Sequence, residues 1–450
     1  MANTYITRTP SSNGNQKTWT FSAWIKNNGK SGDSTYQYLM EAYYGNGTRY
    51  SYVCLRHGTI ETYGGDYSTS STSLSFDVTT NRRLRDPSAW YHVVVTHDTT
   101  ESTSTDRLKI YINGERETSF QGYVGSGASA TFPDLNDDSF FNVTTTQNRI
   151  GKEFDGCMAH VHFVDGTAYD ASTFGETDST SGIWKPKLEP SVTYGTNGFF
   201  LKFENSGNMD LDSSSNNLTF ATTGTLTQNV DTPSNNFATL NPNSSLSNLT
   251  YANGNLQVTG ASSTVWKTTF SSIGMMYGKA GKFYCEMKVS TLNSQAGIGV
   301  WGQPLPQTTT SNFFPNHHQY GFIYKEDGSV SDDSQTFYTG SSFTSGDIIQ
   351  CALDLTNSKI YFGKNGTWQN SGDPTSGSTG TGAVALEDNS DAYFFTASSY
   401  GTDVLQMNFG QGYFGTTAVA SAGSNASGIG IFEYDVPTGY TALSTKGLDT

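Results

Sequence analysis

The stretch WYHVVVTHD at residues 90–98, with RLKIYINGE at 107–115 close behind it, decides the fold of the first half of the chain. In the second stretch apolar and polar residues alternate, which is the period of a strand with one buried face; the apolar ones are Leu108, Ile110 and Ile112. Asn113-Gly114 follows directly, and Asn-Gly is a strong signal for a two-residue hairpin turn. The two stretches therefore predict antiparallel strands with a hairpin at Asn113-Gly114.

The same pattern returns in the second half. IIQCALDL at 348–355 is an apolar strand, and SKIYFGKNG at 358–366 repeats Lys-Ile-Tyr before a second turn signal, Asn365-Gly366. Ile360 and Phe362 then take the buried positions. Two similar sandwiches in tandem would produce this echo, although such hairpins are common in any β protein.

Helices are not expected, because no stretch of a dozen residues shows a 3.6-residue apolar period with caps. The chain has 450 residues, and β-sandwiches reach about 200–250 residues each, so the length fits two large domains. We expect an all-β protein of two tandem antiparallel sandwiches with almost no helix. The boundary is placed between residues 240 and 241, near the loop-like stretch Thr239–Ser247.

The charge of the chain excludes several kinds of partner. Charged residues make up 14% of the chain, against roughly 25% in an ordinary soluble domain, and the net charge is -15. An acidic chain without a basic block lacks the counterion release that drives nucleic-acid binding, and anionic membranes repel it. No stretch approaches 18 uninterrupted apolar residues, and the N-terminus has no apolar signal core. We expect no nucleic-acid partner, membrane insertion, signal peptide or transmembrane segment.

The four cysteines lie in apolar or alternating runs: Cys54, Cys157, Cys285 and Cys351. Four cysteines in 450 residues do not make a disulfide scaffold. The sequence therefore predicts buried thiols that stay reduced.

Catalytic motifs are missing from the sequence. Retaining glycosidases need two carboxylates about 5–5.5 Å apart, and the chain has no Glu-x-Asp-x-x-Glu, no Gly-x-Ser-x-Gly elbow and no phosphate-binding loop. Asp210 and Asp212 share one face, but their Ser- and Asn-rich surroundings provide no apolar contacts to raise a pKa. We expect no enzymatic activity.

A calcium site is the one cofactor that the sequence suggests. Four oxygen-bearing residues are spaced as D-x-D-x-S-x-N, as in many calcium loops: Asp210, Asp212, Ser214 and Asn216. The alternative is an Asx-rich turn that satisfies its own backbone, because the Gly and terminal Glu of the full calcium motif are missing.

Two other clusters also have two interpretations each. His160 and His162 share one strand face and could hold a transition metal, or they are packed or solvent-facing imidazoles. NRRLRDP at 81–87 is the one local basic patch. It is either a solvated loop or an anchor on an acidic neighbour in an assembly.

Aromatic residues interleave with Asn, Ser and Gly in three stretches: 41–50, 61–72 and 308–320. If these are loops, they offer flat apolar platforms and adaptable hydrogen bonds, as carbohydrate sites and paratopes require. If they are strands, the rings simply occupy strand faces. The candidate ligand-binding residues are Tyr43, Tyr44, Tyr63, Tyr67, Phe313, Phe314, His317 and His318.

The first half, residues 1–240, resembles the laminin-G-like, concanavalin A-like sandwich. The resemblance rests on TFSAWIK at 20–26, WYHVVVTHD at 90–98, LKIYINGE at 108–115 and RIGKEFDGCMAHVHFVDGTAYD at 149–170, with His160 where the family usually carries an acidic residue. The block FFLKFENSGNMDLDSSSNN at 199–217 is similar to the opening strand and Asp-Ser-Ser loop of such domains. Here it closes the half, which implies a circularly permuted domain that ends with residues 199–240.

The second half, residues 241–450, resembles a SPRY domain, which is another concanavalin A-like jelly roll. The segments that carry this resemblance are GKFYCEMKV at 281–289, GIGVWG at 297–302, SGDIIQCALDLTNSKIYFGKNG at 345–366 and MNFGQGYF at 407–414.

The combination is similar to virion surface proteins of marine bacteriophages, commonly called tail-fibre or concanavalin A-like structural proteins. Segments outside the two domains add to this resemblance: TRTPSSNGN at 7–15, FGETDSTSGIWKPK at 174–187 and DVPTGYTALST at 435–445. It implies a protein of the virion surface, made in the bacterial cytoplasm, that recognises a host-surface glycan or protein, contacts other virion proteins and forms a homo-oligomer. A purely structural capsid or tail component and a glycan-degrading enzyme are the alternatives.

Overall fold

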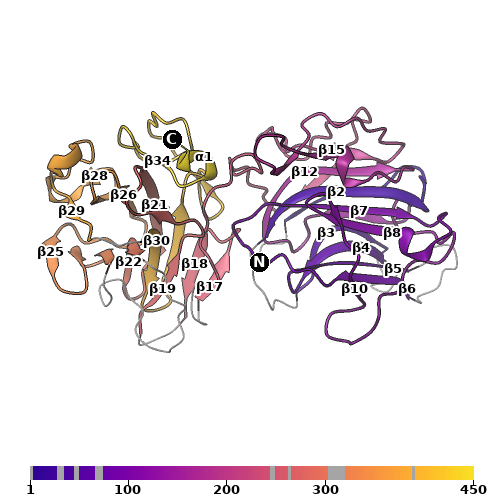
Figure 1. Cartoon of the computed structure of the whole chain (residues 1–450), viewed down its shortest axis with the longest axis horizontal. Helices are drawn as coiled ribbons and strands as arrows, with labels where there is room; N and C mark the ends of the chain where they lie inside the picture. The colour runs from indigo at the N-terminus through magenta and orange to yellow at the C-terminus, as the bar shows by residue number, and fades with distance from the viewer. Residues whose placement is uncertain are drawn as a thin grey trace. The chain divides into compact units, whose positions relative to one another are not determined.

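The structure, a computed structural model, describes residues 4–27, 35–44, 50–65, 74–243, 249–261, 265–302, 320–387 and 391–449 (Figure 1). Its contacts divide the chain into two compact units, Met1–Gln228 and Asn229–Thr450, so the division precedes the predicted boundary between residues 240 and 241. Packing explains the difference. Phe237 and Leu240 lie in the core clusters of the second unit, and the Ala238 N–H donates to the Leu443 carbonyl.

The first unit is a sandwich of two sheets. The sheet here called the β3 sheet runs in the order β10 (Phe120–Gln121), β6 (Leu74–Thr80), β5 (Thr59–Gly65), β4 (Tyr50–Arg56), β3 (Gln37–Tyr43), β11 (Gln147–Ile150), β1 (Tyr5–Arg8), β16 (Ala221–Thr223). The β2 sheet runs in the order β15 (Phe199–Leu201), β12 (Gly156–Asp165), β2 (Thr18–Asn27), β7 (Tyr91–Asp98), β8 (Leu108–Ile112), β9 (Glu115–Arg116). Phe21, Val53 and Ile110 are fully buried in the core that these strands form.

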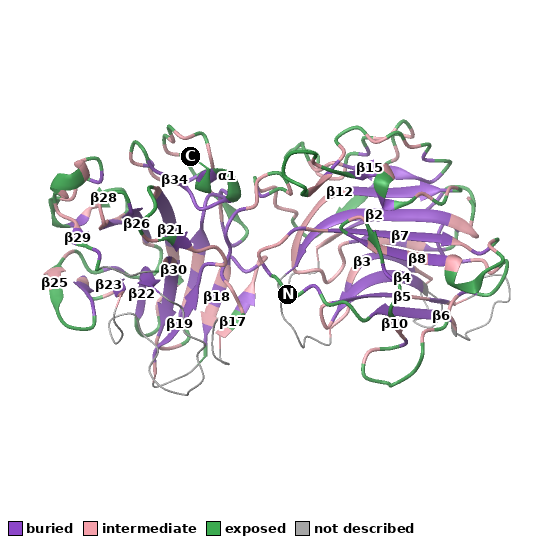
Figure 2. Cartoon of the chain, viewed as in Figure 1, coloured by how far each residue is buried: buried purple, intermediate pink, exposed green. Residues whose placement is uncertain are grey.

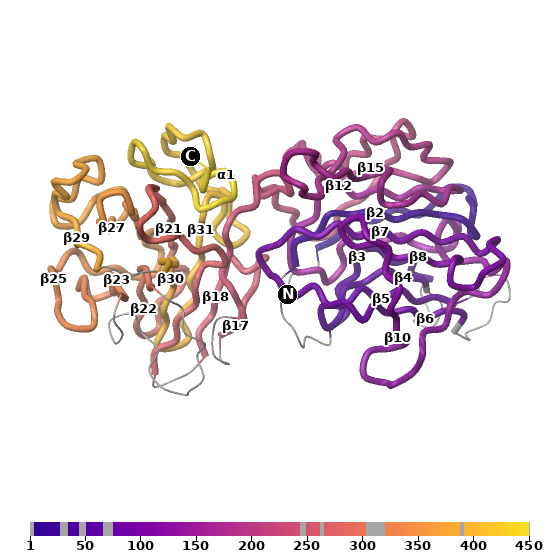
Figure 3. Tube along the Cα trace, viewed as in Figure 1, coloured from indigo at the N-terminus to yellow at the C-terminus, as the bar shows by residue number. Residues whose placement is uncertain are grey.

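The late block of the first half completes both sheets. β15 pairs with β12, and β16 pairs with β1, both antiparallel. The block therefore closes the first unit, as the sequence suggested, and its trace can be followed in Figure 3.

The outer face of the β2 sheet is covered by the chain itself. β13 (Gly175–Thr177) and β14 (Trp184–Pro186) form a small hairpin whose Trp184 packs with Val94, Phe174 and Phe200 on that face. Figure 2 accordingly shows β2 and β7 buried along most of their length. The hairpin therefore covers the part of this face around Val94 and Phe200.

Three histidines lie within that covered layer. The His162 ring stacks on Phe200 at 3.9 Å, and its Nδ1 is 2.9 Å from the Tyr194 hydroxyl. His160 sits at a β-bulge with φ of 48°. Trp184 Nε1 donates to His92 Nδ1, so the other ring nitrogen of His92 carries the proton that faces Ser22 Oγ. Among the described residues no three His, Cys, Asp or Glu side chains are grouped as a metal site.

The second unit repeats the plan. Its β21 sheet runs in the order β17 (Leu249–Ala252), β18 (Gln257–Gly260), β31 (Val404–Asn408), β21 (Lys282–Thr291), β26 (Ile348–Asp354), β27 (Lys359–Lys364), β28 (Thr367–Trp368), with β29 (Val384–Ala385) beside β27 and β34 (Thr441–Ala442) beside β21. Its β22 sheet runs in the order β19 (Lys267–Phe270), β30 (Ala392–Ser399), β22 (Ala296–Gly302), β23 (Gly321–Lys325), β24 (Ser329–Ser331), β25 (Thr336–Thr339), with β20 (Met275–Met276) beside β30. β32 (Tyr413–Phe414) and β33 (Thr417–Ala418) form a separate hairpin.

Regular structure is almost entirely β, as predicted. Within the described ranges α1 (Thr445–Leu448) is the one α-helix, and short 3-10 turns occur at Ser104–Asp106, Ala171–Thr173, Gln369–Ser371 and Gly377–Thr379. No helix in the described part of the chain has the length and apolar character of a membrane span. Strand pairing is antiparallel throughout this part except between β21 and β34.

Both predicted hairpins are confirmed. Asn113-Gly114 joins β8 to β9 and Asn365-Gly366 joins β27 to β28, with both residues of each pair at positive φ. This is the type I′ geometry that Asn-Gly favours, because its twist matches that of the flanking strands. The buried alternation is confirmed too, since Ile110, Ile112, Ile360 and Phe362 are at most 1% exposed.

The outer face of the β21 sheet is covered by the end of the chain (Figure 3). Glu286 is the buried anchor: its Oε1 accepts from Tyr284 Oη and the Tyr434 N–H, and its Oε2 from the Glu433 N–H and Asn408 Nδ2. Carboxylates are rarely buried without such partners. Glu286 therefore binds the 433–434 segment to the sheet.

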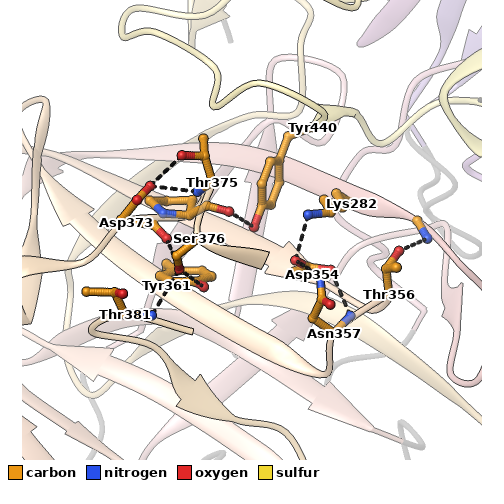
Figure 4. A network of polar contacts seen from close by, with 12 residues as sticks. Lys282, Asp354, Thr356, Asn357, Tyr361, Asp373, Thr375, Ser376, Thr381 and Tyr440 are labelled. Atoms are coloured by element: carbon orange, nitrogen blue, oxygen red, sulfur yellow. Dashed lines mark hydrogen bonds and ion pairs between the residues drawn. The ribbon is translucent and has the colours of Figure 1, made fainter. Parts of the chain in front are cut away.

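A second polar network holds Tyr440 beside the same sheet (Figure 4). Lys282 Nζ is 2.8 Å from the carboxylate of the fully buried Asp354, which also accepts from the backbone and side chain of Asn357. Tyr440 Oη donates to the Pro374 carbonyl, and Lys282 lies 5.5 Å from the Tyr440 ring centroid.

The cysteines differ in burial. Cys54, Cys285 and Cys351 are buried, whereas Cys157 is only half-buried, which corrects the expectation that all four are buried. Cys285 and Cys351 stand directly opposite each other on β21 and β26. Burial raises the pKa of the Cys54 and Cys285 thiols, which makes them poor nucleophiles.

Thiol titration should therefore separate the four cysteines. In the native protein Cys157 should react first and the three buried thiols far more slowly, while all four should react in denaturant. Cys157→Ser should remove the fast phase alone. Fewer than four reactive thiols in denaturant would contradict the prediction that all are reduced.

Acid should destabilise the first unit through its histidines. Burial lowers the pKa of His92 to about 3 and of His97 to about 4, and it also lowers the pKa of His162. Below about pH 6.5 the unfolded chain takes up protons that the folded unit does not, so the free energy of unfolding falls by up to about 1.4 kcal/mol per pH unit for each histidine. The loss should end at the pKa of the folded form.

Calorimetry between pH 7 and pH 4.5 measures this effect, with His162→Phe as the comparison. Burial raises the pKa of Glu61 and Asp77, and these groups oppose the histidines, so the slope difference between the two proteins is the readout. The variant should lose stability less steeply as the pH falls. An unchanged slope for His162→Phe would contradict the lowered pKa of His162.

In the second unit burial raises the pKa of Glu286 to about 7. The stabilising contribution of this group is therefore present in acid and is lost as the pH rises toward 7.

Candidate functional site: the tyrosine face of the first unit

The structure describes three of the eight aromatic and histidine candidates. Tyr43 ends β3 and Tyr63 lies within β5, so both belong to strands rather than to loops. Tyr44 follows β3 and packs on Phe140 at the core, with ring centroids 5.9 Å apart. The others lie outside the described residues: Tyr67, Phe313, Phe314, His317 and His318.

Strand register brings Tyr63 into a row of polar side chains across the outer face of the β3 sheet. Directly opposed partners on successive strands are Asp77, Tyr63, Tyr52, Glu41, Arg149 and Thr7. Because side chains alternate between faces, residues two apart on each strand join this row. The resulting surface, here called the tyrosine face, carries Tyr5, Tyr36, Tyr38, Tyr43, Tyr52 and Tyr63.

The rings of the tyrosine face contact one another. Tyr52 and Tyr63 stack with centroids 5.2 Å apart, and Tyr38 meets Tyr52 edge-on at 5.4 Å. Tyr36 stacks on Tyr38 at 5.8 Å. Tyr52 is buried beneath the others, which are half-buried and present part of each ring. Tyr52 thus supports the other rings from below, and the half-buried rings keep part of their surface accessible.

Charged groups surround the rings on the β11 side. Arg149 Nη1 is 3.1 Å from Glu41 Oε1, and its guanidinium lies 4.0 Å from the Tyr43 ring centroid. Lys152 Nζ is 3.7 Å from the same Glu41 oxygen and 5.5 Å from the Tyr38 centroid. These contacts hold the rings by cation–π attraction and leave hydrogen-bonding groups at their edges.

Arg56 anchors the opposite side of the face. Its guanidinium lies 4.4 Å from the Tyr36 ring and 4.1 Å from the Tyr123 ring, and its Nη1 is 3.6 Å from Glu61 Oε2. Tyr52 Oη donates to Glu61 Oε1 at 2.7 Å. Burial raises the pKa of Glu61, although Tyr52 and Arg56 favour its charged form. This buried ion pair fixes Tyr36 and Tyr52 in place.

The calcium candidate is organised as a backbone turn. Asp212 Oδ1 accepts from the N–H groups of Phe200 and Ser214, and Oδ2 accepts from Ser214 Oγ and the Leu218 N–H. Asp210 accepts from Thr222 instead, and Asn216 donates to the carbonyls of Gly195 and Gly198. The Asp212 carboxylate thus accepts from backbone N–H groups of its own loop, as the alternative of an Asx-rich turn predicts.

The basic patch is tied to its own unit in part. Arg82 is paired with Glu115 at 2.9 Å and with Glu117 at 3.0 Å, so it binds the β8–β9 hairpin. Arg83 and Arg85 are exposed.

Most of the tyrosine face was not predicted from the sequence. Tyr5, Tyr36, Tyr38 and Tyr52, with their charged neighbours, were not among the candidates. The alternation of Tyr with Leu, Met or Val in residues 36–43 and 50–56 was the available signal, because it places the rings on the face opposite the core. Register between the strands, which joins them into one surface, is a property of the fold.

Two family profiles match the chain. Residues 1–172 match the profile described as the concanavalin A-like lectin/glucanases superfamily, and residues 282–412 match that of the SPRY domain. A comparison with curated proteins finds no match.

Solved structures similar to the chain include SPRY domains. The SPRY domain of human HERC1 is 19% identical with a TM-score of 0.29, and the alignment covers 37% of this chain and 96% of that chain. Another human SPRY domain is 16% identical with a TM-score of 0.25, covering 34% and 90%. The structure of stonustoxin is 14% identical with a TM-score of 0.27, covering 38% and 27%.

The profiles agree with the two antiparallel sandwiches and lie one in each unit. The chain therefore contains a concanavalin A-like domain in its first unit and a SPRY domain in its second.

Proposed function

We propose that the chain is a non-catalytic recognition protein of a phage virion surface, and that it binds a host-surface glycan through the tyrosine face. The observation that supports this most is the set of half-buried rings on a sheet face over which the described residues form no hairpin of the kind seen on the β2 sheet. Domains of both families often mediate binding, which agrees with this role.

Sugar chemistry fits the tyrosine face. Pyranose rings have apolar faces that stack on aromatic rings and hydroxyl edges that hydrogen-bond to polar groups. Tyr63 and Tyr43 supply stacking surfaces, and Arg149 and Lys152 lie beside the rings as donors. A peptide would also find hydrogen bonds here, so a protein receptor is the second ligand to test.

Catalysis is not part of the proposal, because the carboxylates of the face serve its structure. Glu41 is 3% exposed and paired with Arg149, and Glu61 is fully buried against Arg56 and Tyr52. A glycosidase acid must reach the glycosidic oxygen of its substrate. Buried and paired carboxylates are poorly placed for that.

The virion role is supported by the sequence resemblance, with the two domains as its framework. A receptor-binding protein of a particle needs contacts with other virion proteins and gains avidity as a homo-oligomer. If the chain is purely structural, it will contact its neighbours but bind no host glycan. Adsorption assays separate these two roles.

Replacing a half-buried ring should weaken binding without unfolding the domain. Tyr63→Ala should reduce the affinity for host cells or a glycan-array hit by about 1–3 kcal/mol, because a stacking surface is lost. Tyr44→Ala is the matched control: it removes a ring that packs on the core and should cost about 2–3 kcal/mol of stability with little change in affinity.

The measurements are adsorption to host cells and the melting temperature of each variant. The proposal fails if Tyr63→Ala, Tyr43→Ala and Tyr38→Ala all lower the melting temperature and none selectively lowers adsorption.

Incubation with host glycans should release no reducing sugar. The reason is that Glu41 and Glu61 are held in ion pairs below the rings. Release that disappears in Glu61→Gln, at an unchanged melting temperature, would show instead that the chain is a glycan-degrading enzyme.

A further inference from the structure

A groove lies at the edge of the β3 sheet, beside β1. It has a volume of about 590 Å³, which is within the usual range of ligand pockets, and it runs between β1 and the stretch that leads into β16. Its polar lining residues include Thr7, Thr9, Thr219, Gln147 and Asn217, and the Thr7 hydroxyl donates to the Ala221 carbonyl. Arg8 is the one ionisable residue in the lining.

The charge of Arg8 has little direct compensation. The side chain is half-buried, and Nη1 donates to Asn197 Oδ1 at 3.4 Å, the one hydrogen bond of this guanidinium within the described part of the chain. A guanidinium has five N–H donors, so most of its capacity is available. Burial lowers the pKa of Arg8, which reports the cost of holding the charge there.

Other arginines of this unit show what a structural guanidinium looks like. Arg56 is paired with Glu61, and Arg149 is paired with Glu41. Arg107 donates to three backbone carbonyls, those of Glu101, Ser102 and Pro133. Arg8 has neither a contacting carboxylate nor a set of carbonyls among the described residues, although it is half-buried like Arg107 and Arg149.

The nearest carboxylate cannot take that role. Asp212 attracts the charge of Arg8, but the two form no ion pair within 4 Å in the described structure. Both oxygens of Asp212 are occupied by the four donors described above. An anion in the groove would therefore meet an available guanidinium.

We infer that this groove binds a carboxylate-bearing sugar, with the carboxylate on Arg8 and the hydroxyls on the neutral polar wall. An arginine fork matches a carboxylate in a bidentate way, and hydroxyl and amide side chains match sugar hydroxyls. Leu218 and Phe220 supply the apolar part of the lining. The groove meets the row of the tyrosine face at Thr7, but the inference does not depend on the function of that face.

The test is titration calorimetry of the full chain with trigalacturonic acid and with its methyl ester, which has the same backbone without charge. The acid should bind, and the ester should bind at least about tenfold more weakly. Arg8→Gln should reduce the affinity for the acid by at least about tenfold, and Arg8→Lys should fall between, because an ammonium cannot make the bidentate contact.

Controls keep the outcome clear. Arg116→Gln removes an exposed arginine paired with Asp106 and should leave the affinity unchanged, and so should Tyr63→Ala if the two sites are separate. If Arg8→Gln does not fold, Thr219→Asp places a like charge on the exposed wall and should weaken binding of the acid.

The inference would be overturned by equal affinity for acid and ester, by an unchanged affinity in folded Arg8→Gln, or by no binding of the acid at about 5 mM. Competition by acetate as strong as by trigalacturonate would show a simple anion site and would also refute the sugar assignment.

Discussion

A β-sheet has two faces, and a sandwich of two sheets buries only one face of each. The outer face of each sheet must therefore be covered by other parts of the chain or carry side chains that are compatible with water. The sheets of this protein meet this requirement in different ways. The β2 sheet is covered by the β13–β14 hairpin, and the β21 sheet by the end of the chain. On the β3 sheet, tyrosines and paired charges occupy the second face.

Buried carboxylates carry out the same task on two of these faces. Glu286 fastens the 433–434 segment to the β21 sheet through backbone N–H groups, while Glu61 fastens tyrosines to the β3 sheet through Arg56 and Tyr52. Hydrogen bonds to a charged acceptor are stronger than neutral ones, and a desolvated carboxylate left without them would be costly. Glu286 and Glu61 thus fix particular groups on each sheet face and do more than add to its stability.

Alternation and turn residues predicted the strands and hairpins of this protein but not the pairing of strands far apart in the sequence. The Asn-Gly pairs and the strands before them were predictable, because side-chain period and positive φ are local properties. Which strands pair with one another was not predictable from these local properties. Tyr63 and Tyr52 are adjacent only through register. Spacing alone left Asp212 open between a calcium loop and an Asx-rich turn, because it does not show which donors the Asp212 oxygens accept from. Phe237 packs in the second unit for the same reason, since its bridge partner Ser444 lies at the far end of the chain.

The late strands also impose an order on synthesis. β1 lies between β11 and β16, and β12 lies between β2 and β15, so β1 and β12 each lack one partner strand until residues 199–223 have left the ribosome. The second unit waits longer, because Ala238 pairs with Leu443. Exposed strand edges recruit other strands. A chain that stops before residue 199 therefore leaves one side of β1 and one side of β12 unpaired, and these strands can pair with those of neighbouring chains.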